Sequence, residues 1–438
     1  MTKNSKYYAL LAFLAMGAVC VTSCEDEDNV ELVGNWVNAR QAMGGSPRGG
    51  AVSFVIDNVA YIGTGANTLN SLDRCRHSDF FSCTPVLGGG RKGAYEKVGV
   101  AYSSSGTIAP MPKFNKDGVV CSRNGAVAFS LNGKGYVGTG YNGNTNLNDF
   151  WEFDPKADFD ASAYRSASEE DKRSIETSAS YPWKQVADYP GDTCRFAVAF
   201  VIPGTSVMSD GTVSQNTRSG KDLAFVGTGE NCIGIKKNEF YSFDGEKWET
   251  VTSIGMPRAQ AVAFVAEGYN ENGQLQLYGY VVGGMSSSPI IGFQRYNALT
   301  DEWEYLRDPA DKTVGFLGDD YYKLALTGST GFVVNGREPY SQRAYLATGG
   351  PYVLGLYCWE YNPYKDSWVQ KSSFEGYPRR FAVSFVLQFP SPFYDGEMMD
   401  IPFVTCGTTS TLNVSGGFGS FFDDTWFFCP NESRESLD

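Results

Sequence analysis

Histidine is almost absent from this chain of 438 residues, which has a single one at position 77. A Ser-His-Asp or Cys-His catalytic set would have to be built on His77, and the sequence has no Gly-x-Ser-x-Gly nucleophile motif to accompany it. One imidazole is also too few for histidine-rich zinc or iron sites, and no Cys-x-x-Cys spacing offers thiolates instead. We therefore expect no metal and no cofactor, and we interpret His77 as a loop histidine.

Positive charge is the second shortage. The chain has 36 Lys and Arg against 49 Asp and Glu, which gives a formal net charge of −13. Proteins that bind nucleic acids usually present a basic face to the phosphates. We therefore expect no nucleic-acid partner.

Long hydrophobic runs are scarce as well. The apolar run at residues 8–21 follows two lysines and is shorter than the roughly 20 residues that a membrane-spanning helix needs. These features predict a signal peptide over residues 1–23. The run ends in Val-Thr-Ser-Cys at 21–24, which resembles the lipobox of bacterial lipoproteins. That resemblance implies that Cys24 is lipidated and becomes the first residue of the mature protein.

An acidic segment, Glu-Asp-Glu-Asp at 25–28, follows the lipobox directly. It resembles the surface-export signal of Bacteroidota lipoproteins. The resemblance implies an outer-membrane protein that is anchored through Cys24 and faces the extracellular side, with a periplasm-facing anchor as the alternative. Residues 24–33 then form a short acidic tether that keeps the folded domain close to the membrane.

Internal repetition is what the chain has in abundance. Six times, an apolar strand is followed by a strand that ends at a glycine-containing turn and then by an aromatic strand. We predict the first strands of the six units at 49–54, 124–129, 196–200, 261–264, 323–326 and 381–385. We predict the third strands at 79–85, 149–155, 239–244, 293–297, 358–363 and 425–430. Repeated units of several short strands are typical of propeller blades, because one unit cannot bury its apolar face alone.

A tryptophan opens the strand after the aromatic one in four units, at Trp183, Trp248, Trp303 and Trp368. Together with the glycine pair and the aromatic third strand, this pattern resembles the Kelch repeat over residues 34–430. The resemblance implies an all-β, six-bladed β-propeller, with residues 431–438 as a tail. Cys83, Cys358 and Cys429 lie in third strands, where we expect buried thiols.

The last unit lacks a Trp-led fourth strand, whereas the first is preceded by an extra one. Residues 36–48, WVNARQAMGGSPR, match the Trp-to-Pro-Arg strand of the other units. We predict that residues 36–45 pair as the outer strand of the blade formed by 381–429. This pairing would close the ring and remove a free sheet edge.

Arginine recurs six residues before the phenylalanine of several first strands, at Arg48, Arg123, Arg258 and Arg379. Kelch domains that capture acidic peptides carry arginine at a similar register around the central opening. The resemblance implies that these four residues bind an anionic ligand or an acidic peptide. In the alternative, each arginine pairs with a carboxylate or a carbonyl group and locks the blades. Tyr141 and Tyr352 are candidate stacking platforms on the same face.

The opposite face is expected to carry the long connections. We predict insertions at 86–105, 156–181, 202–221, 266–275, 328–342 and 387–400, with a short polar helix within 166–178. Residues 387–394, LQFPSPFY, are aromatic and rich in proline. Such a segment suits docking to a partner.

Two classes of function follow. The first is a binding or scaffold propeller that captures a ligand or docks in an outer-membrane complex, such as a transporter or an assembly machine. The second is a carbohydrate-acting enzyme on the same fold, such as a sialic acid mutarotase. A copper-radical oxidase of the galactose oxidase type is excluded, since its site needs two histidines. We favour binding, because the sequence places no acid–base pair at the mouth.

Overall fold

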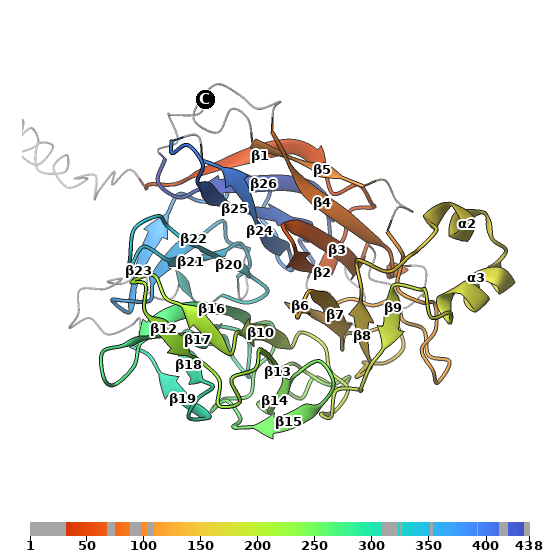
Figure 1. The fold of residues 1–438 in the computed structure, drawn as a ribbon, viewed down its shortest axis with the longest axis horizontal. Coiled ribbons are helices and arrows are strands. Elements are labelled where there is room, and N and C mark those ends of the chain that lie inside the picture. The colour runs from red at the N-terminus through yellow and green to blue at the C-terminus, as the bar shows by residue number, and fades with distance from the viewer. Residues whose placement is uncertain are drawn as a thin grey trace, which may run out of the picture.

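The computed structural model describes residues 32–67, 75–87, 98–103, 108–307, 323–324, 326–350, 354–391, 393–410 and 419–432. In it, six four-stranded antiparallel sheets are arranged in a ring (Figure 1). The prediction of an all-β, six-bladed propeller is therefore confirmed. Within the described ranges, no helix has both the length and the apolar composition that crossing a membrane requires.

Each blade takes its strands from inside to outside in chain order, except the last. Blade 1 consists of β2 (Gly49–Ile56), β3 (Val59–Ala66), β4 (Phe80–Leu87) and β5 (Val98–Tyr102). Blade 2 consists of β6 (Val127–Leu131), β7 (Lys134–Gly138), β8 (Phe150–Phe153) and β9 (Trp183–Gln185). Blade 3 consists of β10 (Val198–Ile202), β13 (Leu223–Gly227), β14 (Phe240–Phe243) and β15 (Trp248–Val251).

The second half of the ring continues the same order. Blade 4 consists of β16 (Val262–Tyr269), β17 (Leu275–Val282), β18 (Phe293–Asn297) and β19 (Glu302–Tyr305). Blade 5 consists of β20 (Thr330–Val334), β21 (Arg343–Ala347), β22 (Cys358–Asn362) and β23 (Ser367–Lys371). Blade 6 consists of β24 (Val383–Pro390), β25 (Met398–Thr405), β26 (Asp424–Cys429) and β1 (Asn35–Ala42).

The N-terminal strand β1 closes the ring, as predicted. It pairs antiparallel with β26, and Trp36 lies opposite Phe428. The Trp36 side chain is only 2% exposed, and its ring centroid lies 4.6 Å from that of Phe428 and 5.0 Å from that of Phe374, which follows the last strand of blade 5. Trp36, in the N-terminal strand, therefore packs between the last two blades of the ring.

Along the innermost strands, buried residues alternate with half-buried ones. In β2, for example, Val52, Phe54 and Ile56 are buried, whereas Ala51 and Ser53 are half-buried. The buried phenylalanine stacks on a tyrosine of the next strand, with 5.3 Å between the centroids of Phe54 and Tyr61. Period-two alternation of this kind places the apolar side chains between neighbouring blades.

A closed circle of backbone hydrogen bonds joins the starts of the six innermost strands. Each residue of the circle donates its N–H to the carbonyl of its counterpart in the preceding blade, at 2.7–3.0 Å. All six have a positive φ, between 55° and 64°. The six are Gly50, Gly125, Phe196, Gln260, Gly328 and Phe381. Three of them are not glycine, so the left-handed conformation is held at an energetic cost that the circle offsets.

The predicted Gly turns after the second strands form another circle. In blade 2, Thr139 and Gly140 are both left-handed, with φ of 60° and 94°. The turn brings the Gly140 N–H to the carbonyl of Cys194 in the next blade, at 2.7 Å. The same bond recurs in every blade at 2.7–2.8 Å, donated by Gly65, Gly140, Gly229, Gly284, Gly349 and Gly407.

The prediction for the first strand of blade 5 is wrong. That strand is β20 at residues 330–334, not 323–326. Leu324 and Leu326 are buried between blades 4 and 5, which explains their apolar character without a strand. The predicted insertion 328–342 therefore contains β20, and the predicted insertion 86–105 contains β5.

The polar helix predicted within 166–178 is confirmed as α3 (Glu169–Glu176). Its N-cap is Ser168, whose hydroxyl accepts the Asp171 N–H, and three acidic residues occupy the first turn. A shorter helix, α2 (Ala161–Ser166), precedes it and was not predicted. Both belong to the connection between β8 and β9 and project from the side of the ring (Figure 1).

Candidate functional site

The four predicted arginines are buried inside the blades. Arg123 is completely buried, and its guanidinium donates two parallel bonds to Asp149, at 2.7 and 3.0 Å. It also donates to the carbonyls of Thr139 and Cys121, at 3.0 and 2.7 Å. The side chain therefore ties the start of the first strand to the second and third strands of its own blade.

Two other arginines repeat this arrangement. Arg48 binds Asp79 at 2.5 and 3.1 Å, and Arg379 binds Asp424 at 2.5 and 2.9 Å. Arg258 departs from it, since its partner is the neutral side chain of Gln294, at 3.3 Å. Burial lowers the pKa of Arg258 to about 10.

This geometry favours the structural alternative for all four residues. The side chains are at most 2% exposed, and each is held by carbonyls as well as by its side-chain partner. The backbone carbonyl of each also accepts an interblade bond from a second-strand glycine. Anion binding by Arg48, Arg123, Arg258 and Arg379 stays an untested prediction, and we place the candidate site elsewhere.

The mouth that these arginines were expected to line is covered by aromatic rings. Phe196 and Phe381 come from blades 3 and 6, which are opposite in the ring, and stack with centroids 4.8 Å apart. Each ring lies over a glycine of the preceding blade. A Cβ at Gly125 would come within 2.8 Å of Phe196, and one at Gly328 within 2.9 Å of Phe381. The phenylalanine pair therefore covers the axis at this end.

The stacking platform expected at Tyr141 is already occupied. Its side chain is 4% exposed, and the guanidiniums of Arg76 and Arg195 lie 4.7 and 5.6 Å from its ring centroid. Arg195 in turn pairs with Glu230 at 2.8 Å. Tyr352, the other expected platform, lies outside the described residues.

His77 is a half-buried loop residue. Its backbone N–H donates to the Gly65 carbonyl at 2.9 Å, and its own carbonyl accepts the Arg123 N–H. Burial, followed by the charge of Arg48, lowers the pKa of His77 below its usual value. The imidazole is therefore neutral at pH 7, in keeping with the interpretation of His77 as a loop histidine.

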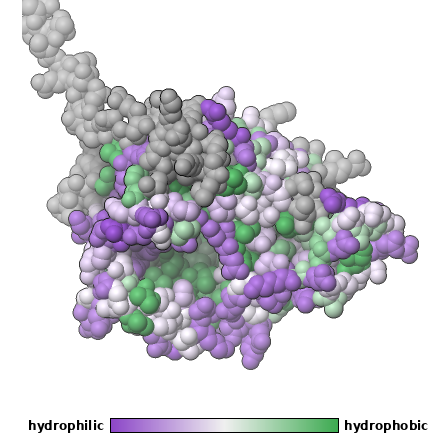
Figure 2. Space-filling model, turned by 45° about the horizontal axis from the view of Figure 1, so that its top comes forward, coloured by the Kyte–Doolittle hydropathy of each residue, from purple (hydrophilic) through white to green (hydrophobic). Residues whose placement is uncertain are grey.

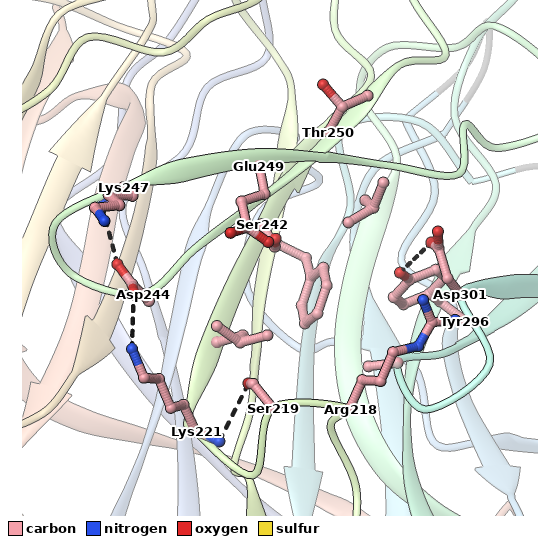
Figure 3. A pocket seen from close by; sticks show the side chains of 14 residues that line it. Arg218, Ser219, Lys221, Ser242, Asp244, Lys247, Glu249, Thr250, Tyr296 and Asp301 are labelled. Carbon is pink, nitrogen blue, oxygen red and sulfur yellow. Dashed lines mark hydrogen bonds and ion pairs between the residues drawn. The ribbon is translucent and has the colours of Figure 1, made fainter.

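A small polar pocket lies between blades 3 and 4 (Figure 3). Its volume is about 220 Å³, and its charged groups are largely engaged. The Lys221 ammonium lies 3.2 Å from Asp244, whose pKa is lowered first by the Lys247 backbone N–H. The Tyr296 hydroxyl donates to Asp301 at 2.6 Å. Asp244 and Asp301 are hydrogen-bond acceptors that hold turns, so neither is a free general base.

A larger recess, here called the blade-4 recess, runs along the outer strands of blade 4. Its volume is about 1340 Å³, and it shares Asp301 with the smaller pocket. Aromatic and polar side chains line it together, among them Tyr269, Gln276, Tyr278, Arg295, Glu304 and Tyr305.

On the side of the molecule seen in Figure 2, a hollow with a hydrophobic floor is bordered by hydrophilic side chains.

Exposed apolar side chains gather on the connections between first and second strands of blades 3, 5 and 6. We call them the docking strip: Val207, Val213, Tyr340, Phe393, Tyr394 and Met398, which are 44–71% exposed. Val207 and Val213 face each other in the hairpin of β11 (Thr205–Val207) and β12 (Val213–Gln215). Of the segment 387–394, in which the sequence predicted a docking surface, Phe393 and Tyr394 belong to the strip, whereas Leu387 and Phe389 are buried in β24.

Contacts between the connections make the strip continuous. The Tyr340 N–H donates to the Ser209 hydroxyl, next to the β11–β12 hairpin, at 3.2 Å. From the same connection as Tyr340, the Arg337 guanidinium stacks on Tyr394, 4.1 Å from its ring centroid, and pairs with Glu397. Three blades therefore contribute to one surface.

The described residues include no metal-ligand cluster, and their thiols are buried except that of Cys232, which is exposed. No group of three or more His, Cys, Asp or Glu side chains in that part of the chain could hold a metal ion. Cys83, Cys358 and Cys429 are buried free thiols, as expected, and burial raises the pKa of Cys83 to about 12. Cys24 and the acidic residues 25–28 lie outside the described ranges.

Comparison with known proteins gives no relative: no family model matches the chain, and no curated protein matches it.

Proposed function

We propose that this protein is a Kelch-type, lipid-anchored binding propeller of the bacterial outer membrane that docks a protein partner on its docking strip. The observation that carries the proposal is the strip itself. Contiguous exposed apolar surface is rare on proteins that act alone, and tyrosine, phenylalanine and methionine are enriched at protein interfaces. The propeller then acts as a scaffold rather than as a catalyst.

The strip is built on anchored segments, which favours a preformed binding surface. The buried carboxylate of Glu267 accepts from the Ser209 N–H, the Ser209 hydroxyl and the Tyr364 hydroxyl, each at 2.6 Å. These bonds fix the end of the β11–β12 hairpin to blades 4 and 5. A surface that is ordered before binding loses less conformational entropy when the partner arrives.

Binding is favoured over the carbohydrate-acting enzyme by the state of the ionisable groups. At the mouth, Asp79, Asp149 and Asp424 are engaged by arginines, and His77 is held in a loop. No acid–base pair among these residues is left to act on a substrate. The partner we expect is an outer-membrane protein, such as a transporter or an assembly machine.

The anchor has its own test. Cys24→Ala should release the protein from the membrane or leave it unprocessed, because the acyl chains supply about 0.8 kcal/mol per buried CH₂. Replacing residues 25–28 with alanine should keep the protein anchored but protect it from protease added to intact cells. A wild-type protein that is already protected from protease would contradict the extracellular assignment.

The docking strip should decide what the protein captures from detergent-solubilised outer membranes. We expect the double variant Phe393→Ser and Tyr394→Ser to lose its partner, because both side chains are about half exposed or more and contribute apolar area. Tyr377→Ser is the matched control, since Tyr377 is 72% exposed and lies next to Arg379, before the first strand of blade 6, away from the strip. Equal recovery of the same outer-membrane protein with both variants would refute docking at the strip.

A further inference from the structure

The geometry of the blade-4 recess points to a second binding site, whose ligand class is a neutral saccharide. This site is separate from the docking strip and does not rest on it. Four side chains carry the argument: Gln276, Arg295, Glu304 and Tyr305.

Gln276 presents a buried donor with no acceptor. The residue is 3% exposed and lines the recess, and no hydrogen-bond partner of its amide nitrogen Nε2 is found among the residues that the structure describes. Buried amide groups in folded proteins nearly always have a partner. Nε2 is closed to solvent as it stands, so an oxygen of a molecule in the recess would supply the missing acceptor once the amide turns toward it.

The charged groups of the recess exclude an anionic occupant. Among the lining residues that the structure describes, Arg295 is the one cation. It already binds Glu304 at 2.6 Å and the Tyr269 carbonyl at 3.1 Å, and its guanidinium lies 4.1 Å from the ring centroid of Tyr278. Three further carboxylates line the recess, at Glu271, Asp301 and Glu302. An anion would be repelled, whereas a hydroxyl group can donate to these carboxylates.

A purely cationic ligand does not fit either, because it could not accept a bond from Gln276. Hydroxyl groups both donate and accept, so they satisfy the amide and the carboxylates together. Tyr305 is 69% exposed and Tyr269 is 38% exposed, and such amphipathic rings can cover the apolar C–H face of a sugar.

The size of the recess favours a chain of sugar units. Its volume of about 1340 Å³ exceeds the roughly 300–1,000 Å³ of a typical small-molecule pocket. The recess is therefore large enough for an oligosaccharide.

Calorimetric titration of the full-length protein with neutral gluco-, manno-, galacto- and xylo-oligosaccharides tests this site. We expect at least one series to bind, and Gln276→Met to weaken it about tenfold through the loss of one hydrogen bond. Gln276→Met should not lower the melting temperature, since it removes an unpartnered polar group. Tyr305→Ser should also weaken binding, whereas Tyr377→Ser should not.

The outcomes of these titrations distinguish saccharide binding at the blade-4 recess from partner docking at the docking strip. Saccharide binding that survives the strip variant Phe393→Ser and Tyr394→Ser supports an independent site. The proposal is overturned if no neutral oligosaccharide binds, if only acidic saccharides or peptides bind, or if Gln276→Met and Tyr305→Ser leave the affinity unchanged.

Discussion

A chain that lacks residues 32–42 should not form a stable propeller. The deletion removes β1, leaves the backbone of β26 unpaired along one edge, and opens a gap beside blade 5. Global stability of single domains is about 5–15 kcal/mol, and the loss of a whole strand together with the buried Trp36 should remove most of it. We expect the deleted chain to show no cooperative melt and to aggregate through its exposed edge.

Two graded experiments separate ring closure from general damage. Trp36→Ala should lower the free energy of unfolding by about 3–5 kcal/mol, because it empties a site between Phe374 and Phe428. Val33→Ala, at a residue that is 46% exposed, is the control and should change it little. A synthetic peptide of residues 32–45 should restore a cooperative melt to the deleted chain, since strand addition completes the sheet. A deleted chain that melts like the intact protein would show that β1 is not the closing strand.

Arg123→Ala should destabilise the propeller by about 3–5 kcal/mol. The substitution leaves the carboxylate of Asp149 buried without its cation, and removing one member of a buried ion pair typically costs this much. Arg165→Ala, at an exposed position of α2, should be nearly neutral. Urea unfolding of the three proteins measures the difference. An unchanged midpoint for Arg123→Ala would restore the ligand-binding interpretation of the arginines.

The stability of Arg123→Ala should depend on pH differently from that of the wild type. Burial alone would raise the pKa of Asp149, but the charge and hydrogen bonds of Arg123 outweigh burial and lower that pKa below its usual value. In the wild type, the Arg123–Asp149 pair stabilises the fold above about pH 4. This stabilisation is lost as the pH falls through the lowered pKa of Asp149. In Arg123→Ala burial is opposed only by the remaining hydrogen bonds, such as that from the Trp151 indole N–H, so the pKa of Asp149 is higher than in the wild type. The difference in the free energy of unfolding between the wild type and Arg123→Ala should therefore become smaller below about pH 4.

Most of the fold could be predicted from the repeats, because each blade carries the same alternation of buried and half-buried residues. The closing strand was predictable for the same reason, since Trp36 occurs in a Trp-to-Pro-Arg segment with no blade before it. The first strand of blade 5 was not found. Its Gly331 occupies a position that is Ala or Ser in other blades, whereas the nearby Leu324 and Leu326 imitate a strand.

The arginine register was found in the sequence, and pairing of each arginine with a carboxylate or a carbonyl group was one of the two predicted alternatives, but the individual partners were not predicted. A signal for their partners existed in the Asp-Phe pairs that open the third strands, at Asp79 and Asp149. No local sequence pattern shows how deeply a side chain is buried. Whether a guanidinium faces solvent or a carboxylate depends on the interblade bonds, which join residues about 30 to 75 positions apart, or more where the ring closes.

The docking strip was predicted only in part. Its segment in blade 6 has an aromatic, proline-rich composition that suggests docking. Tyr340 and the β11–β12 hairpin meet that segment through contacts such as Tyr340 with Ser209, which are 131 residues apart in the chain. The blade-4 recess likewise depends on the way in which Gln276, Arg295 and Tyr305 converge from three strands.

Photocrosslinking in intact cells tests the docking proposal most directly. A benzophenone side chain at position 393, in the docking strip, should form a crosslink to one defined outer-membrane protein under irradiation. The same group at position 377, which is more exposed but lies away from the strip, should form none. Crosslinks to the same partner from 377 and none from 393 would contradict docking on this surface.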